Sequence, residues 1–171
     1  ERLVETALAE LQRLIADLRP SHLDDLGLPA ALRWYAGEIQ SRLQLQVDVE
    51  ISGEQNDLPS ETKTTLFRVA QEALTNVIKH ANASRAWVRL DYRAEGVALH
   101  VVDDGCGFDP GKVKASRRPS WGLVGMEERA ALLAGKMQIL SYPGKGTRVE
   151  VYIPYHAKDE DHSHENPPLA G

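Results

Sequence analysis

The chain has 171 residues, of which 42% are hydrophobic and 26% are charged, and its formal net charge is −5. This composition is typical of a globular protein with one buried core. The acidic balance provides no basic field for a nucleic acid, so we expect no nucleic-acid partner. The single cysteine, Cys106, excludes an internal disulfide framework and fits a reducing compartment, for which we expect the cytoplasm.

No segment contains the roughly 20 consecutive apolar residues that span a bilayer, so we expect this chain to make no direct membrane contact. The chain begins with Glu1, inside a helical pattern. We therefore expect it to be a piece of a longer protein, which could itself be anchored in a membrane.

The first 18 residues carry apolar side chains at alternating intervals of four and three. They are Val4, Leu8, Leu11, Ile15 and Leu18. Such a heptad stripe predicts a helix that packs against a partner helix. Pro20 ends it, and Pro29 suits the first turn of a second helix that is expected to reach about residue 43.

The middle of the chain predicts a strand followed by a long helix. Apolar and polar residues alternate over 45–51, which is typical of a half-buried strand. Ser60 is a suitable N-cap for a helix over 61–82, which has an apolar face.

The remaining elements include four further strands and one helix. The strands are expected near 85–93, 96–103, 136–142 and 147–154, and the helix over about 123–134, ending at Gly135. Residues 104–121 predict a long loop, which in a compact domain is usually functional, and 156–171 a disordered tail. The element order predicts an α/β fold, a two-layer sandwich with helices on one face of a mixed, mainly antiparallel sheet.

Polar residues recur on one face of the helix over 61–82. They are Glu72, Asn76, Lys79 and His80. A glutamate can accept a proton, an asparagine oxygen can bind Mg²⁺, and a lysine can neutralise phosphate. By itself, the stripe is more simply interpreted as a solvated helix face.

Three glycine-containing segments follow. Asp103 ends an apolar strand and is followed by Gly105 and Gly107, which leave room for a flat ring or a mobile loop. Gly122 and Gly125 lie where a helix is expected to begin, and such glycines expose N–H groups that favour phosphate. The fourth cluster, 144–147, is Gly-Lys-Gly-Thr. Each segment alone fits an ordinary turn or helix start.

The order of the four clusters resembles the N, G1, G2 and G3 boxes of one ATP-binding fold. This Bergerat or GHKL fold is shared by gyrase, the heat-shock chaperone ATPase, MutL and histidine kinases, and the resemblance covers about residues 45–154. The wording of 67–76, 79–81 and 103–109 is similar to sensor histidine kinases paired with helix-turn-helix response regulators. So is the junction that begins with Leu18-Arg19-Pro20.

The resemblance implies a division of the chain into four parts. Residues 1–20 would be the end of a dimerisation helix, 21–43 the junction and first helix, 44–155 the ATP-binding catalytic domain, and 156–171 the tail. It also implies a homodimeric parent that passes the γ-phosphate of ATP to a histidine and then to an aspartate of the response regulator.

The resemblance also implies residue roles. Asp103 would accept a hydrogen bond from the adenine amino group with support from Thr147, Asn76 would bind Mg²⁺, and Glu72 would act as general base or assist the metal. The full set of nucleotide-binding residues would be Asn76, Lys79, His80, Asp103, Gly105, Gly107, Gly122, Leu123, Gly125, Met126 and Thr147.

One feature of the subfamily is missing: a phosphoacceptor segment resembling Glu-Leu-His-Asp. None of the six histidines has a suitable position; they are His22, His80, His100, His156, His162 and His164. We therefore expect the acceptor to lie on a helix outside this chain and self-phosphorylation of the chain to be weak or absent. Two alternatives stay open: another ATPase of the same fold, such as an anti-sigma-factor serine kinase, and a nucleotide-binding interaction module without chemistry.

Overall fold

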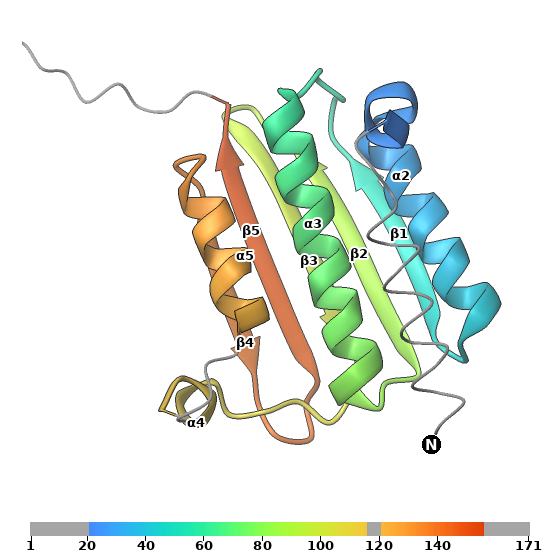
Figure 1. Cartoon of the computed structure of the whole chain (residues 1–171), viewed down its shortest axis with the longest axis vertical. Helices are drawn as coiled ribbons and strands as arrows, with labels where there is room; N and C mark the ends of the chain where they lie inside the picture. Colours follow the sequence, from blue (N-terminus) through green and yellow to red (C-terminus); the bar gives the residue numbers. More distant parts are fainter. Residues whose placement is uncertain (1–20, 116–120, 156–171) are drawn as a thin grey trace, which may run out of the picture.

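The computed structural model describes residues 21–115 and 121–155, which form one sheet covered on one face by helices (Figure 1). The strands are β1 (Gln46–Ser52), β2 (Arg85–Tyr92), β3 (Gly96–Asp103), β4 (Lys136–Ser141) and β5 (Thr147–Pro154). The helices are α2 (Ser21–Arg42), α3 (Ser60–Asn76), α4 (Pro110–Ala115) and α5 (Trp121–Ala131), and a π-helical turn, η1 (Val77–Ala81), continues α3.

The sheet is mixed, with strand order β1-β2-β3-β5-β4. β1 and β2 are parallel, and the other three neighbouring pairs are antiparallel. Two adjacent parallel strands need a long crossover, and α3 provides it between β1 and β2. The predicted α/β sandwich with a mainly antiparallel mixed sheet is therefore confirmed.

The core lies between the sheet and α2, α3 and α5, which Figure 1 shows side by side on the same face. β2 alternates between buried and exposed residues, and its buried residues face the helices, whereas β3 in the middle of the sheet is buried at most positions. Fully buried side chains come from both layers: Leu28, Tyr35 and Ile39 of α2, Leu66, Val69 and Leu74 of α3, Val88 and Leu90 of β2, Leu99 of β3 and Met126 of α5.

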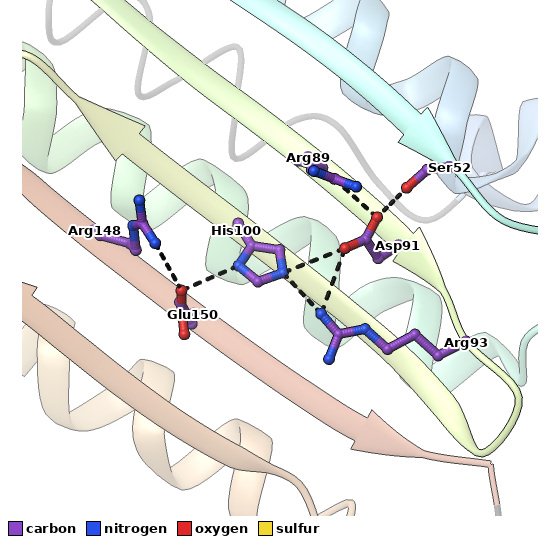
Figure 2. A network of polar contacts seen from close by, with 7 residues as sticks. All are labelled: Ser52, Arg89, Asp91, Arg93, His100, Arg148 and Glu150. Atoms are coloured by element: carbon purple, nitrogen blue, oxygen red, sulfur yellow. Dashed lines mark hydrogen bonds and ion pairs between the residues drawn. The ribbon is translucent and has the colours of Figure 1, made fainter.

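The opposite face of the sheet carries a polar network over β2, β3 and β5 (Figure 2). His100 lies between two carboxylates, with Nε2 3.6 Å from Asp91 and Nδ1 3.4 Å from Glu150. Arg89 Nε is 2.9 Å from Asp91, which also accepts a hydrogen bond from Ser52. No described helix covers these residues, so the sheet has one apolar face and one charged face, as antiparallel sheets often do.

The expected helix start near Pro29 agrees with the structure: Gly27 has non-helical φ and ψ of 75° and 163°, so residues 21–26 of α2 are a short helical segment before the kink and Pro29 lies in the first turn after it. Three other predictions about local structure differ in detail. Ser60 is the first residue of α3 rather than its N-cap, which is Pro59. The expected loop 104–121 contains the short helix α4. α5 begins at Trp121, about two residues earlier than expected, so Gly122 and Gly125 both lie within its first turns.

The helix expected over 61–82 is not α-helical throughout. It changes to π-helical geometry at Val77, and Asn82 follows with a left-handed φ of 48°. A π turn contains more residues than an α turn, so residues after Asn76 are rotated away from the positions that an α-helical period gives them. The heptad helix 1–18 and the tail 156–171 lie outside the described residues.

Candidate functional site

A cavity of about 260 Å³ lies at the end of β3, beneath the end of α3 and beside the start of β5. Its wall is mostly apolar, with a few polar groups, as in small-molecule sites. Six of the residues that the sequence indicated for nucleotide binding line it: Asn76, His80, Asp103, Gly107, Leu123 and Thr147. The structure thus brings together residues from all four sequence clusters.

Asp103 is the buried carboxylate of the cavity, with only 6% of its surface exposed. It ends β3 and pairs in register with Thr147 of β5. Its Oδ1 accepts a hydrogen bond of 2.8 Å from the N–H of Gly105. Burial raises the pKa of Asp103 above its ordinary value, the nearby charge of Asp104 adds to this effect, and the N–H groups of Gly105 and Thr147 only partly oppose it. A donor from a ligand would therefore find a poorly solvated acceptor here.

The neighbouring Asp104 has a structural role. Its Oδ1 accepts hydrogen bonds of 2.9 Å from the N–H groups of Ser84 and Arg85, and its Oδ2 accepts one of 2.6 Å from the Ser84 hydroxyl. These bonds, with that from the Ser84 hydroxyl first among them, lower the pKa of Asp104. Asp104 thus fastens the end of β3 to the start of β2, and this anchor fixes the chain on which Asp103 is held.

Ser141 is a buried residue of the site that the sequence did not indicate. Its Oγ accepts a hydrogen bond of 2.8 Å from the N–H of Phe108 and donates one of 3.0 Å to the carbonyl of Gly146. It also lies 3.0 Å from Thr147 Oγ1. Since the only proton of Ser141 goes to Gly146, Thr147 must donate in the shared bond. The lone pairs of the Thr147 hydroxyl consequently stay available as acceptors at the cavity.

The glycines after Asp103 are required by neighbouring backbone rather than by a ligand ring. A Cβ on Gly105 would overlap the carbonyl of Ala81, and one on Gly107 would overlap the carbonyl of Tyr142. Gly107 also has a left-handed φ of 58°. Between them, the N–H of Cys106 donates to the Ala81 carbonyl at 2.7 Å. Of the two glycines only Gly107 lines the cavity.

The helical wall comes from α3 and η1. Asn76 is half-buried, and no described residue makes a hydrogen bond with its side chain. After the change to π geometry, His80 lines the cavity, whereas Lys79 is exposed outside the lining. The shared face that an α-helical period predicted for these residues is therefore only partly present.

Four other expected site residues also lie outside the lining. Met126 is fully buried in the core, and Gly125 lies near the guanidinium of Arg129. Glu72 is half-buried, and its carboxylate lies against Gly122 in the first turn of α5. The structure therefore separates a cavity wall from a second contact between α3 and α5.

Most of the remaining wall is apolar, and no pattern in the sequence marked it as part of a binding site. It consists of Ala73, Val77, Ala81, Val101, Cys106, Phe108, Val113, Ile139 and Val149. Several of these belong to the apolar periods of α3, β3 and β5, which identify them as core residues. The period shows that a side chain faces inward, but not that the space beside it is open.

These features define a class of protein, an α/β sandwich with a mostly apolar cavity at the end of its sheet and one buried carboxylate in the cavity wall. Residues 61–157, more than half of the chain, match the family described as "Histidine kinase-, DNA gyrase B-, and HSP90-like ATPase". The chain belongs to this family, as the order of its four boxes predicted.

Similar proteins are named as sensor kinases. The chain is 37% identical over 153 residues to the signal transduction histidine-protein kinase/phosphatase DegS of Brevibacillus brevis, covering 90% of the chain and 39% of that protein. It is 36% identical over 154 residues to the sensor histidine kinase LiaS of Bacillus subtilis strain 168, covering 90% and 41%. The chain thus spans about two fifths of the length of these relatives.

A solved structure agrees with the fold. The histidine kinase domain of the blue-light activated histidine kinase from Erythrobacter litoralis EL346 superposes with a TM-score of 0.60 at 26% identity, covering 75% of the chain and 65% of that domain. Within residues 21–115 and 121–155, every helix is too short or too polar to cross a membrane.

Proposed function

We propose that this chain is the ATP-binding catalytic part of a sensor histidine kinase, which binds Mg-ATP and passes its γ-phosphate to a histidine of a dimerisation helix. The observation that carries the proposal is the buried carboxylate of Asp103 in an apolar cavity. Adenine combines an apolar ring with an exocyclic amino group, and this wall offers apolar contact together with one strong acceptor.

The two acceptors at the inner end of the cavity suit the edge of the base. The N–H groups of Gly105 and Thr147 both donate to the Asp103 carboxylate, which has about four acceptor positions and so keeps capacity for the amino group. The lone pairs of the Thr147 hydroxyl can accept from the base or from a water beside it. Guanine carries a carbonyl where adenine carries its amino group, so the same acceptors would disfavour it.

Asn76 is the residue that fits a magnesium ion. Its side chain has no hydrogen bond within the described part of the chain and borders the cavity, and a neutral oxygen is a ligand that Mg²⁺ accepts. Within residues 21–115 and 121–155, no group of three histidine, cysteine or acidic side chains is placed to form a metal site. A single protein ligand, with phosphate oxygens and water as the others, is the usual arrangement for this ion. The bound ion would neutralise phosphate charge.

The other expected residues take supporting roles in the proposal. Glu72 acts as general base or orients the attacking imidazole, and Lys79 and His80 contact phosphate. Gly122, Gly125 and the backbone around Leu123 and Met126 belong to the helix beside the phosphates. The proposed partners are a response regulator with a helix-turn-helix output domain and, in the parent, a second copy of the kinase. The identity to named sensor histidine kinases supports this interpretation over a serine kinase of the same fold.

Calorimetry with ATP in the presence of Mg²⁺ or EDTA tests the proposal. We expect the wild-type chain to prefer ATP over GTP and to bind it more tightly with Mg²⁺. Asn76→Ala should remove the magnesium dependence, because the ion loses its protein ligand. Gln138→Ala, an exposed change on β4, is the matched control and should bind as wild type. Equal affinity for ATP and GTP, or an unaltered magnesium dependence in Asn76→Ala, would contradict the proposal.

A further inference from the structure

Gly122 of α5 lies directly against the side chain of Glu72 on α3. A Cβ on Gly122 would overlap Glu72 Oε1 and would lie 3.0 Å from its Cδ and 3.5 Å from its Cγ. All three of the nearest atoms to such a Cβ belong to Glu72. α3 and α5 lie side by side in Figure 1, so this contact joins two neighbouring helices of the same layer.

The backbone of Gly122 does not itself require glycine. Gly122 lies within α5 and is not among the residues with positive φ. Glycine in a helix is less favourable than alanine, because it loses more conformational freedom on folding. The reason for a glycine at this position is therefore the space that its missing side chain leaves, and the Glu72 carboxylate occupies that space.

The position of the carboxylate is also favourable electrostatically. The first turn of a helix has N–H groups without intrahelical acceptors, and the helix dipole favours a negative charge there. The charge of Glu72 also affects the pKa of Tyr35 on the neighbouring helix α2. Burial is the main cause that raises the pKa of Tyr35 of α2 to about 12, the Thr75 hydroxyl lowers it, and Glu72 adds to the increase. Glu72 thus lies within the helical layer, where its direction depends on its neighbours.

We propose that Gly122 is a positioning residue: its missing side chain lets the first turn of α5 hold the Glu72 carboxylate in the direction needed for proton transfer. This inference rests on the proposed role of Glu72 as general base. It gives Gly122 a task different from that of a phosphate-binding amide. The docking of α5 on α3 then fixes the base before the acceptor histidine arrives.

An added methyl group at residue 122 should move the base without unfolding the protein. The overlapping atom is the far end of a flexible side chain, so Glu72 can turn to another rotamer while the backbone stays in place. We expect Gly122→Ala to keep a Tm within about 4 °C of wild type, because the gain in helix propensity offsets the lost contact. The loss should appear in catalysis, not in folding.

The first measurement is phosphoryl transfer from ATP to the acceptor histidine in the parent kinase. General acid–base catalysis contributes on the order of 10²–10⁴-fold to rates, so a displaced base should lower kcat about 10-fold or more with an unchanged KM for ATP. The matched control is Gly37→Ala, the same change at an exposed helical glycine of α2. A Cβ there meets no atom within 4 Å, and we expect the wild-type rate.

A double-mutant comparison shows whether the loss acts through Glu72. Glu72→Gln should lower kcat by itself, and Gly122→Ala should then cause little further loss. The same fold loss in both backgrounds would overturn the inference, and so would a wild-type rate in Gly122→Ala. A wild-type rate in Glu72→Gln would overturn the base role, and the positioning role with it. If Mg-ATP binding itself is absent, it is the proposed function that fails.

A second measurement needs no acceptor. In the chain labelled with ¹³C at the glutamate carboxyl carbon, the Glu72 resonance is assigned by its loss in Glu72→Gln. Gly122→Ala should shift this resonance, whereas Gly37→Ala should not. An unshifted Glu72 resonance in Gly122→Ala would overturn the contact even if the kinase assay showed a loss.

Discussion

Replacing Asp103 by asparagine changes the cavity while keeping its shape. The N–H of Gly105 donates to Oδ1 of Asp103 at 2.8 Å, in a place that is buried from water. The introduced side-chain amide must satisfy this donor with its oxygen, because a buried unpaired N–H is costly. Its NH₂ group then points where the second carboxylate oxygen was, and two donors face each other when adenine binds.

The magnitude follows from the bond that is lost. A hydrogen bond to a charged group contributes about 1.5–3 kcal/mol, which corresponds to roughly 10- to 100-fold in affinity. We expect Asp103→Asn to weaken ATP binding by this factor in calorimetry and to reduce the preference for ATP over GTP. An unchanged ATP affinity would refute the reasoning.

The same substitution should not destabilise the fold. The pKa of Asp103 is raised above its unfolded value, chiefly by burial, so its ionisation at neutral pH opposes folding and the penalty grows as pH rises through the shifted pKa. The neutral amide avoids this penalty. Asp104→Asn is the matched control and should show the reverse pattern: a lower Tm, because the anchor to Ser84 and Arg85 is weakened, with an ATP affinity close to wild type.

Two further predictions concern stability. Ser141→Ala removes the acceptor for the Phe108 N–H and the donor to the Gly146 carbonyl, so we expect the free energy of unfolding in urea to fall by about 1–3 kcal/mol. Ser141→Thr keeps the hydroxyl and should lose less. Equal losses in the two variants would contradict the assigned hydrogen bonds. Burial acts to raise the pKa of Asp91, but the hydrogen bonds from Ser52, Arg89 and Arg93 and the charge of Arg89 together lower it. The ionised Asp91 carboxylate therefore stabilises the fold above its unfolded pKa of about 4, and this stabilisation is lost as pH falls through the lowered pKa. When Tm is measured from pH 6 to pH 2, the Tm of Asp91→Asn should fall less than that of wild type. Identical acid profiles would show that the network of Figure 2 does not stabilise the fold.

The sheet could be predicted from the sequence because β1, β2 and β5 alternate between apolar and polar residues with a period of two, and β3 is a short apolar run. β1, β2 and β5 follow the expected ranges within about two residues. Helix α4 could not be predicted in this way, because its six residues are too few to show an apolar period. The change from α to π geometry at Val77 has no compositional signal.

The candidate site shows a similar division. The position of Asp103 and Thr147 beside glycines and the place of Asn76 on the polar face of its helix indicated a site, and all three line one cavity. Ser141 was missed because its importance depends on pairing across β4 and β5 with Thr147, to which no local pattern points. Gly105 and Gly107 were expected to leave room for a ring or a mobile loop, but in the structure neighbouring backbone carbonyls occupy the space where their Cβ atoms would lie. A sequence shows that a side chain is missing, whereas only the fold shows which atom takes its place.

That distinction changes how the two adjacent carboxylates of the site are understood. Asp103 and Asp104 have the same side chain and occupy one turn, yet their pKa values move in opposite directions. The difference arises because Asp104 receives three hydrogen bonds from Ser84 and Arg85, while Asp103 is buried with one oxygen committed to Gly105. A carboxylate whose bonds are all satisfied by the protein strengthens the fold and has little left for a ligand. A buried carboxylate with unused acceptor capacity destabilises the fold when it is ionised at neutral pH. A hydrogen bond from a ligand donor would reduce this destabilisation. In this chain the hydrogen bonds of Asp104 stabilise the same turn and so offset the destabilisation that comes from burying the ionised Asp103 carboxylate.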